Sequence, residues 1–132
     1  MITEVNIQRV EAKREHKDLI ANMKFNINFD EVKVDKENVN VEFTFTTDYE
    51  GQEGSKNIGR LETKGNIVSK ESKKDTEEIV SMWKDKKTLP INFAEDVINM
   101  LNFECGSRGT LVAYSMGFVA PLPLSRARLQ EK

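Results

Sequence analysis

The segment from residue 39 to residue 49 constrains the fold more than any other, because mainly apolar side chains alternate with polar ones along it. A period of two is typical of a β-strand with one buried face, since successive side chains of a strand point to opposite faces of the sheet. A strand with one buried and one solvent-exposed face is typical of an antiparallel sheet. The residues expected to face the core are Val39, Val41, Phe43, Phe45, Thr47 and Tyr49.

The segment before it alternates in the same way from Met23 to Phe29. Its phase changes near Asp30, and the residues from Asp35 to Asn38 are turn formers. The two segments are therefore expected to form a β-hairpin with one apolar face. The phenylalanines expected to lie under the helices are Phe25, Phe29, Phe43 and Phe45.

Two further strands complete the predicted sheet. One runs through Leu61 and Ile67, with Gly65 placed where a bulge or a close approach of another backbone is expected. The other lies near the amino terminus, where the apolar phase slips by one residue between Ile7 and Val10. Such a slip is typical of a β-bulge, and this segment is predicted to be an edge strand.

Helical patterns follow the strands. A first helix is predicted to begin at Asp75, which with Glu78 forms a capping-box pattern. A second is predicted to begin at Asn92 for the same reason, with Glu95 as its partner. A strand-rich half followed by a helical half indicates an α+β fold, and residues 1–132 are of a length suited to a single domain.

The glycines at 106 and 109 are expected to break or kink the second helix. A Gly-x-x-Gly turn between helices is also how KH domains clamp a nucleic-acid backbone. The net charge of −2 gives no basic patch for phosphates, so a helix kink is favoured and nucleic acid is not implied.

No reactive constellation is visible in the sequence. His16 stands in a charged run without a neighbouring metal ligand, and Cys105 is expected to pack rather than to react. A lone cysteine favours a reducing cytoplasm, and no segment approaches the roughly 18 apolar residues that span a bilayer. The sequence therefore predicts no enzyme, no cofactor, no metal site and no membrane insertion.

The segment after the second helix contains more large apolar residues than a small core needs. Residues 120–124 (APLPL) cannot stay helical, because proline lacks a backbone donor. We call these five residues the strap, and we expect it to lie across an apolar surface. Phe118, Val119, Leu122 and Leu124 are expected to be partly exposed, and either a client polypeptide or another subunit would cover them.

The chain resembles the SecB family of export chaperones and its SecB-like relatives. The segment from Leu61 to Ile67 (LETKGNI) is similar to the strand E-x-x-G-x-[FI] of that family. Leu89-Pro90 precedes a helix that leads through the Arg108-Gly109 pair to the strap, as in SecB.

The resemblance implies a four-stranded antiparallel sheet with C-terminal helices packed on one face, assembled as a dimer of dimers. It also implies an ATP-independent holdase that binds unfolded or nascent polypeptides in apolar grooves. The residues that would bind polypeptide, by position, are Tyr114, Phe118, Val119, Leu122 and Leu124.

The C-terminal segment differs from that of export SecB, and this difference concerns binding to SecA. Export SecB continues past the strap into another helix and an acidic tail, whereas here a basic segment, residues 125–132, follows. Docking to the export motor SecA is thereby in doubt, and a dedicated client such as an antitoxin is at least as well supported. The alternatives are a non-chaperone oligomeric adaptor that binds one folded partner and, less favoured, KH-like RNA binding.

Overall fold

The computed structural model describes residues 1–15, 20, 22–51 and 57–115, with side chains up to residue 108. Four strands form one sheet in the order β1-β4-β3-β2, and all neighbours are antiparallel. The α+β class and the four-stranded antiparallel sheet predicted from the sequence are confirmed. The elements are β1 (Ile2–Arg14), β2 (Asn22–Asp35), β3 (Asn38–Glu50), β4 (Asn57–Lys70), α1 (Lys73–Lys86) and α2 (Ile91–Ser115).

The predicted hairpin is formed by β2 and β3, which pair from Asn22 opposite Glu50 down to Asp35 opposite Asn38. The register shifts between Phe29 and Glu31, so the phase change near Asp30 is a real irregularity of the strand. At the turn, Lys36 adopts the left-handed region with φ of 57°. The turn uses a lysine there rather than the Asp or Asn that flank it, although those residues tolerate this region better.

The amino-terminal strand is an edge strand with a bulge, as predicted. β1 pairs only with β4 in the described part of the chain, and its register shifts between Ile7 and Arg9. Ile7 lies opposite Gly65, so the bulge and the glycine meet at one place. A Cβ added to Gly65 would lie 2.0 Å from the backbone oxygen of Asn6. The close approach predicted from the glycine is therefore confirmed.

One face of the sheet carries the core. The apolar row of β3 is fully buried there, together with Ile67 of β4 and residues of both helices. A second, smaller cluster is formed by Tyr49, Ile58 and Leu61. Thr47 lies on the same face and is 0% exposed.

Both helices begin one or two residues earlier than predicted. The N-cap of α1 is Ser72, whose hydroxyl accepts a hydrogen bond of 3.2 Å from the backbone N–H of Asp75. Asp75 is thus in the first turn rather than at the cap. The second predicted start is also wrong, because α2 begins at Ile91 and the N–H of Ala94 donates to the carbonyl of Pro90.

The predicted break at the glycines does not occur, because α2 runs from Ile91 to Ser115 through Gly106 and Gly109. A glycine inside a helix costs only about 1 kcal/mol relative to alanine. Val97, Leu101 and Cys105, spaced four residues apart, are each at most 1% exposed against the main core. Their packing outweighs the glycine penalty.

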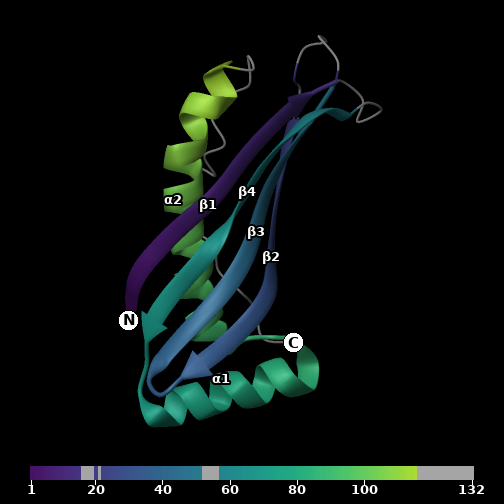
Figure 1. The fold of residues 1–132 in the computed structure, drawn as a ribbon. Helices are drawn as coiled ribbons and strands as arrows, with labels where there is room; N and C mark the ends of the chain where they lie inside the picture. Colours follow the sequence, from purple (N-terminus) through teal and green to yellow (C-terminus); the bar gives the residue numbers. More distant parts are fainter. Residues whose placement is uncertain (16–19, 21, 52–56, 116–132) are drawn as a thin grey trace.

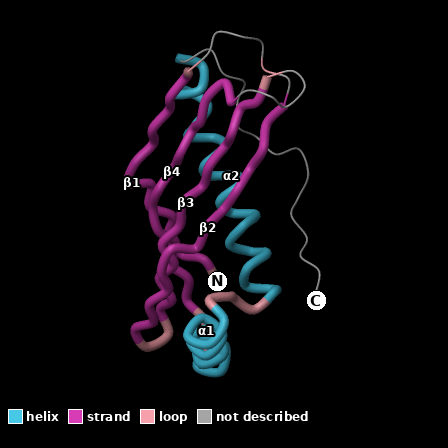
Figure 2. The backbone as a smooth tube through the Cα atoms, turned by 90° about the vertical axis from the view of Figure 1, so that its right-hand side faces the viewer, coloured by secondary structure: helices cyan, strands magenta, loops and turns pink. Residues whose placement is uncertain are grey.

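The helices cover the same face of the sheet unequally. α2 runs along the sheet and contacts β1 and β4, whereas α1 lies across the end near the β2–β3 turn and contacts β2 (Figure 1). Figure 2 shows α1 end-on at the base of the sheet. The main helix contact of β2 is therefore with α1, whereas α2 packs mainly on β1 and β4.

Candidate polypeptide-binding surface

The residues predicted to bind polypeptide fall largely outside the described residues. This applies to Phe118, Val119, Leu122 and Leu124, and to the whole strap. Tyr114 lies in the last turn of α2, and its side chain is outside the described set. Their role stays a prediction, and the site must be built from other residues.

The described part of the chain offers an apolar surface on β2. We call its members, which lie on the core face of the strand before the register shift, the β2 apolar row: Met23, Phe25, Ile27 and Phe29. Each is only half-buried, whereas their neighbours Phe43 and Phe45 on β3 are at most 2% exposed. Phe25 packs on Phe45 with ring centroids 6.2 Å apart. Phe25, Phe29, Phe43 and Phe45 were all expected to lie under the helices. The two on β3 are buried as expected, whereas the two on β2 are only half-buried.

The backbone of the same strand is also available. β2 is an edge strand, and within the described residues it pairs with β3 alone. Its run from Asn22 to Phe29 is free of register shifts. The opposite edge, β1, is interrupted by shifts near Thr3 and Gln8. Because bulges disturb strand addition, β2 is the better edge for an added strand.

The solvent side of α2 adds one large aromatic. Phe103 is 65% exposed, the most exposed aromatic side chain among the described residues, and nearby Met100 is half-buried against the main core. The sequence pattern did not single out Phe103. An aromatic residue three positions after Met100 is compatible with either a buried or an exposed face, so only the packing of α2 reveals it.

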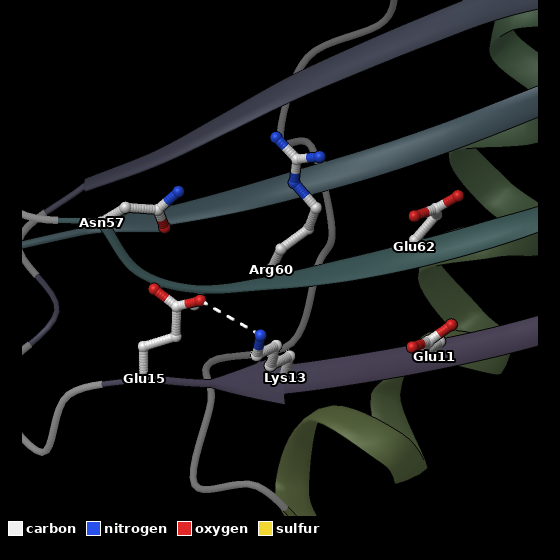
Figure 3. Close-up of a pocket in the computed structure, with 7 residues that line it drawn as sticks. Glu11, Lys13, Glu15, Asn57, Arg60 and Glu62 are labelled. Carbon is white, nitrogen blue, oxygen red and sulfur yellow. Dashed lines mark ion pairs between the residues drawn. The ribbon is translucent and has the colours of Figure 1, made fainter.

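The opposite face of the sheet is charged. A shallow depression of about 260 Å³ is lined by residues of β1 and β4 (Figure 3). Lys13 pairs with Glu15 at 3.4 Å, and Arg60 pairs with Asp48 at 2.7 Å. The hydrogen bond and charge of Asp48 raise the pKa of Arg60. The described residues that line this depression are mostly charged, and several of them form ion pairs with one another or with neighbouring side chains.

Two buried side chains have raised pKa values. Burial raises the pKa of the Cys105 thiol to about 12, with a smaller contribution from the charge of Glu104. The cysteine is 1% exposed, which agrees with its predicted packing role. Burial also raises the pKa of Tyr49 to about 12. His16 lies outside the described residues.

The described residues contain no group of three or more His, Cys, Asp or Glu side chains that could hold a metal ion. Neither helix, within those residues, is long and apolar enough to cross a membrane.

Comparison with known proteins gives a structural match without a sequence match. No protein-family model matches the chain, and no curated protein matches it significantly. The fold is similar to that of a SecB-like chaperone of Mycobacterium tuberculosis, solved in complex with a ChAD peptide from the HigA1 antitoxin. The TM-score is 0.56 at 12% sequence identity, over 100% of this chain and 91% of that chain. The fold is therefore SecB-like.

Proposed function

We propose that this protein is a holdase chaperone that binds non-native polypeptides without a nucleotide. The observation that carries the proposal is the half-buried β2 apolar row beside an edge strand whose backbone can pair with another chain. An extended client can add main-chain hydrogen bonds at such an edge, while apolar surface accepts its side chains with little regard to sequence.

The energetics suit a holdase. A fully buried aliphatic or aromatic client side chain contributes about 1.5–3 kcal/mol before ordering costs. The β2 apolar row is long enough to contact several such side chains, since alternate residues of a strand share one face. Ordering of the client removes much of the gain, so binding through many weak contacts would be reversible.

The structural neighbour supports a polypeptide client, because it is a SecB-like chaperone bound to an antitoxin peptide. On that basis we propose a dedicated client, for which an antitoxin is one candidate, in preference to general export through SecA. We also propose that the protein acts in the cytoplasm as a homo-oligomer, with a dimer of dimers as the expected form. Tyr114, Phe118, Val119, Leu122 and Leu124 would extend the client surface beyond β2.

The proposal is tested by light scattering of a chemically denatured, aggregation-prone client diluted into buffer with this protein. The wild type should suppress aggregation at stoichiometric ratios without nucleotide. The variant Ile27→Thr/Phe29→Thr should suppress it poorly. A matched control, Asn26→Thr/Asn28→Thr, places the same residue on the opposite face of the same strand and should act like the wild type.

The oligomeric mass and thermal unfolding of each variant must be measured beside the assay. Loss of suppression at unchanged mass and fold supports the client surface. A wild type that fails to affect aggregation contradicts the proposal and favours an adaptor that binds one folded partner. The variant Leu122→Asp/Leu124→Asp tests the strap in the same way, and full activity of this variant would remove the strap from the client surface.

A further inference from the structure

A separate groove lies between α1 and the last residues of β2, beyond the β2 apolar row. Its volume is about 550 Å³, within the range of about 300–1,000 Å³ that is usual for small-molecule sites. The apolar residues that line it are Val32, Val34, Val80 and Trp83. Three of them are packed half-buried against the main core, whereas Val80 is 45% exposed. The groove therefore offers apolar surface to a ligand.

The acidic residues of the groove, both on β2, already have partners. The carboxylate of Asp30 accepts a hydrogen bond of 2.6 Å from the hydroxyl of Thr44. The carboxylate of Glu31 lies 3.7 Å from the Nζ of Lys33 in an ion pair. A cationic ligand would have to compete with these contacts.

The basic residues of the groove, Lys84 and Lys87 at the end of α1, are arranged differently. Neither forms an ion pair with a carboxylate among the described residues. Lys84 lies in the last turn, where a cation favours the helix, but Lys86 lies in the same turn outside the groove and has the same effect. The backbone N–H of Lys87 donates to the carbonyl of Trp83 at 3.0 Å, and its Nζ lies 5.3 Å from the centre of the Trp83 ring. An ammonium group is thus held beside the apolar surface.

We propose that this groove binds a small amphipathic monoanion, a free fatty acid of medium chain length. The acyl chain would lie against the valines and the Trp83 ring, and the carboxylate would pair with Lys84 and Lys87. A single negative charge suits the groove, because Asp30 and Glu31 on the β2 side would repel a second one. The proposal goes beyond the holdase proposal, since the groove shares no residue with the β2 apolar row.

The test titrates the full-length protein with sodium decanoate, kept below its micelle-forming concentration, and records tryptophan fluorescence. Trp83 is the single tryptophan of the chain and lines the groove, so the signal reports on this site. Binding should saturate, and decanol, which lacks the charge, should bind about threefold more weakly or less tightly still. Raising the salt concentration should weaken binding of decanoate but not of decanol, because exposed charges are screened.

Matched variants separate the groove from attraction by overall charge. The variant Lys84→Gln/Lys87→Gln should bind decanoate about three- to tenfold more weakly, since each exposed ion pair contributes modestly. The control Lys73→Gln/Lys86→Gln removes the same charge from exposed positions of α1 that do not line the groove, and it should bind like the wild type.

A further variant keeps this site apart from the proposed client surface. Ile27→Thr/Phe29→Thr should bind decanoate like the wild type even where it fails to suppress aggregation. If it loses the fluorescence change instead, decanoate binds at the β2 apolar row and the proposal is wrong.

Other results would also overturn the proposal. They are the absence of decanoate binding by the wild type, equally tight binding of decanol, and an equal loss of affinity in the two lysine variants. A fall in oligomeric mass on addition of decanoate would overturn it as well, because a second copy of the chain would then be the occupant of the groove.

Discussion

Replacing Thr47 with valine should stabilise the protein, because the threonine hydroxyl is buried without a partner. Thr47 is 0% exposed, and its Oγ1 forms no hydrogen bond in the described structure. It lies on the core face of β3, between Phe25 on β2 and Leu61 on β4. Valine has nearly the same shape, so the substitution replaces a desolvated polar group with a methyl group and leaves the packing in place.

The magnitude follows from the cost of the unpaired hydroxyl. Burying a hydroxyl without a partner costs about 1–3 kcal/mol in protein mutational data. Allowing for imperfect fit of the new methyl group, Thr47→Val should raise the free energy of unfolding by about 1–2 kcal/mol. For a chain of this length, that is a rise in Tm of about 3–8 °C. The gain should appear in a urea titration as a higher midpoint with an unchanged m-value.

Two matched variants make the reasoning falsifiable. Thr46 is the neighbouring threonine, and its Oγ1 donates to the carbonyl of Asn26 at 3.4 Å. Thr46→Val should therefore give no gain, or lose about 0.5–1.5 kcal/mol. Thr47→Ser keeps the hydroxyl and loses a buried methyl group, so it should destabilise by about 1 kcal/mol. If Thr47→Val destabilises the protein while Thr47→Ser does not, the hydroxyl has a partner and the argument is wrong.

Further substitutions, a pH titration and a thiol-labelling experiment test the fold. Gly65→Ala should lower the free energy of unfolding in urea by about 3 kcal/mol, because its Cβ would meet a backbone oxygen at 2.0 Å. Replacement of the exposed neighbour, Lys64→Ala, should change this free energy little, and equal effects of the two substitutions would contradict the close approach. Ser72→Ala should cost about 1 kcal/mol through the lost cap of α1, and an unchanged urea midpoint would argue against that cap. Stability should fall as the pH rises from about 10 to about 12, because the unfolded chain releases the Tyr49 proton, whose ordinary pKa is near 10, while burial holds the native pKa at about 12. Tyr49→Phe should reduce this dependence of stability on pH. The Cys105 thiol should react with a disulfide reagent at pH 8 only on the timescale of unfolding, and rapid labelling would show that the thiol is accessible.

The sequence by itself determined the strands and their irregularities. The phase slips near Gln8 and Asp30 and the glycine at position 65 each correspond to a local feature of the sheet. These irregularities were predicted correctly because the side chains of a strand have a period of two. One extra residue moves all later side chains to the other face, and this shift is visible in the pattern of apolar and polar residues. The SecB-like fold was implied by the resemblance to the SecB family, which rests on the run of strands, the segment from Leu61 to Ile67 and the pattern from Leu89 onward.

Helix boundaries depended on context that a local pattern lacks. Asp75 and Ser72 are both good capping residues, and in the structure α1 begins after Ser72, whose hydroxyl accepts from the N–H of Asp75. Gly106 and Gly109 are poor helix formers, yet packing of α2 on the sheet carries the helix through them. In both cases a difference of about 1 kcal/mol in local preference is smaller than the tertiary contribution.

The surface proposed to bind clients was also decided by the tertiary structure. The apolar rows of β2 and β3 look alike in sequence, and both were expected under the helices. The strand order places β2 at an edge, and α2 packs on β1 and β4 instead, so the β2 row stays half-buried. The sequence sets which residues share a face, because that is fixed by strand periodicity. Which of those faces is left open depends on strand order and helix placement, which arise from contacts between residues far apart in the chain.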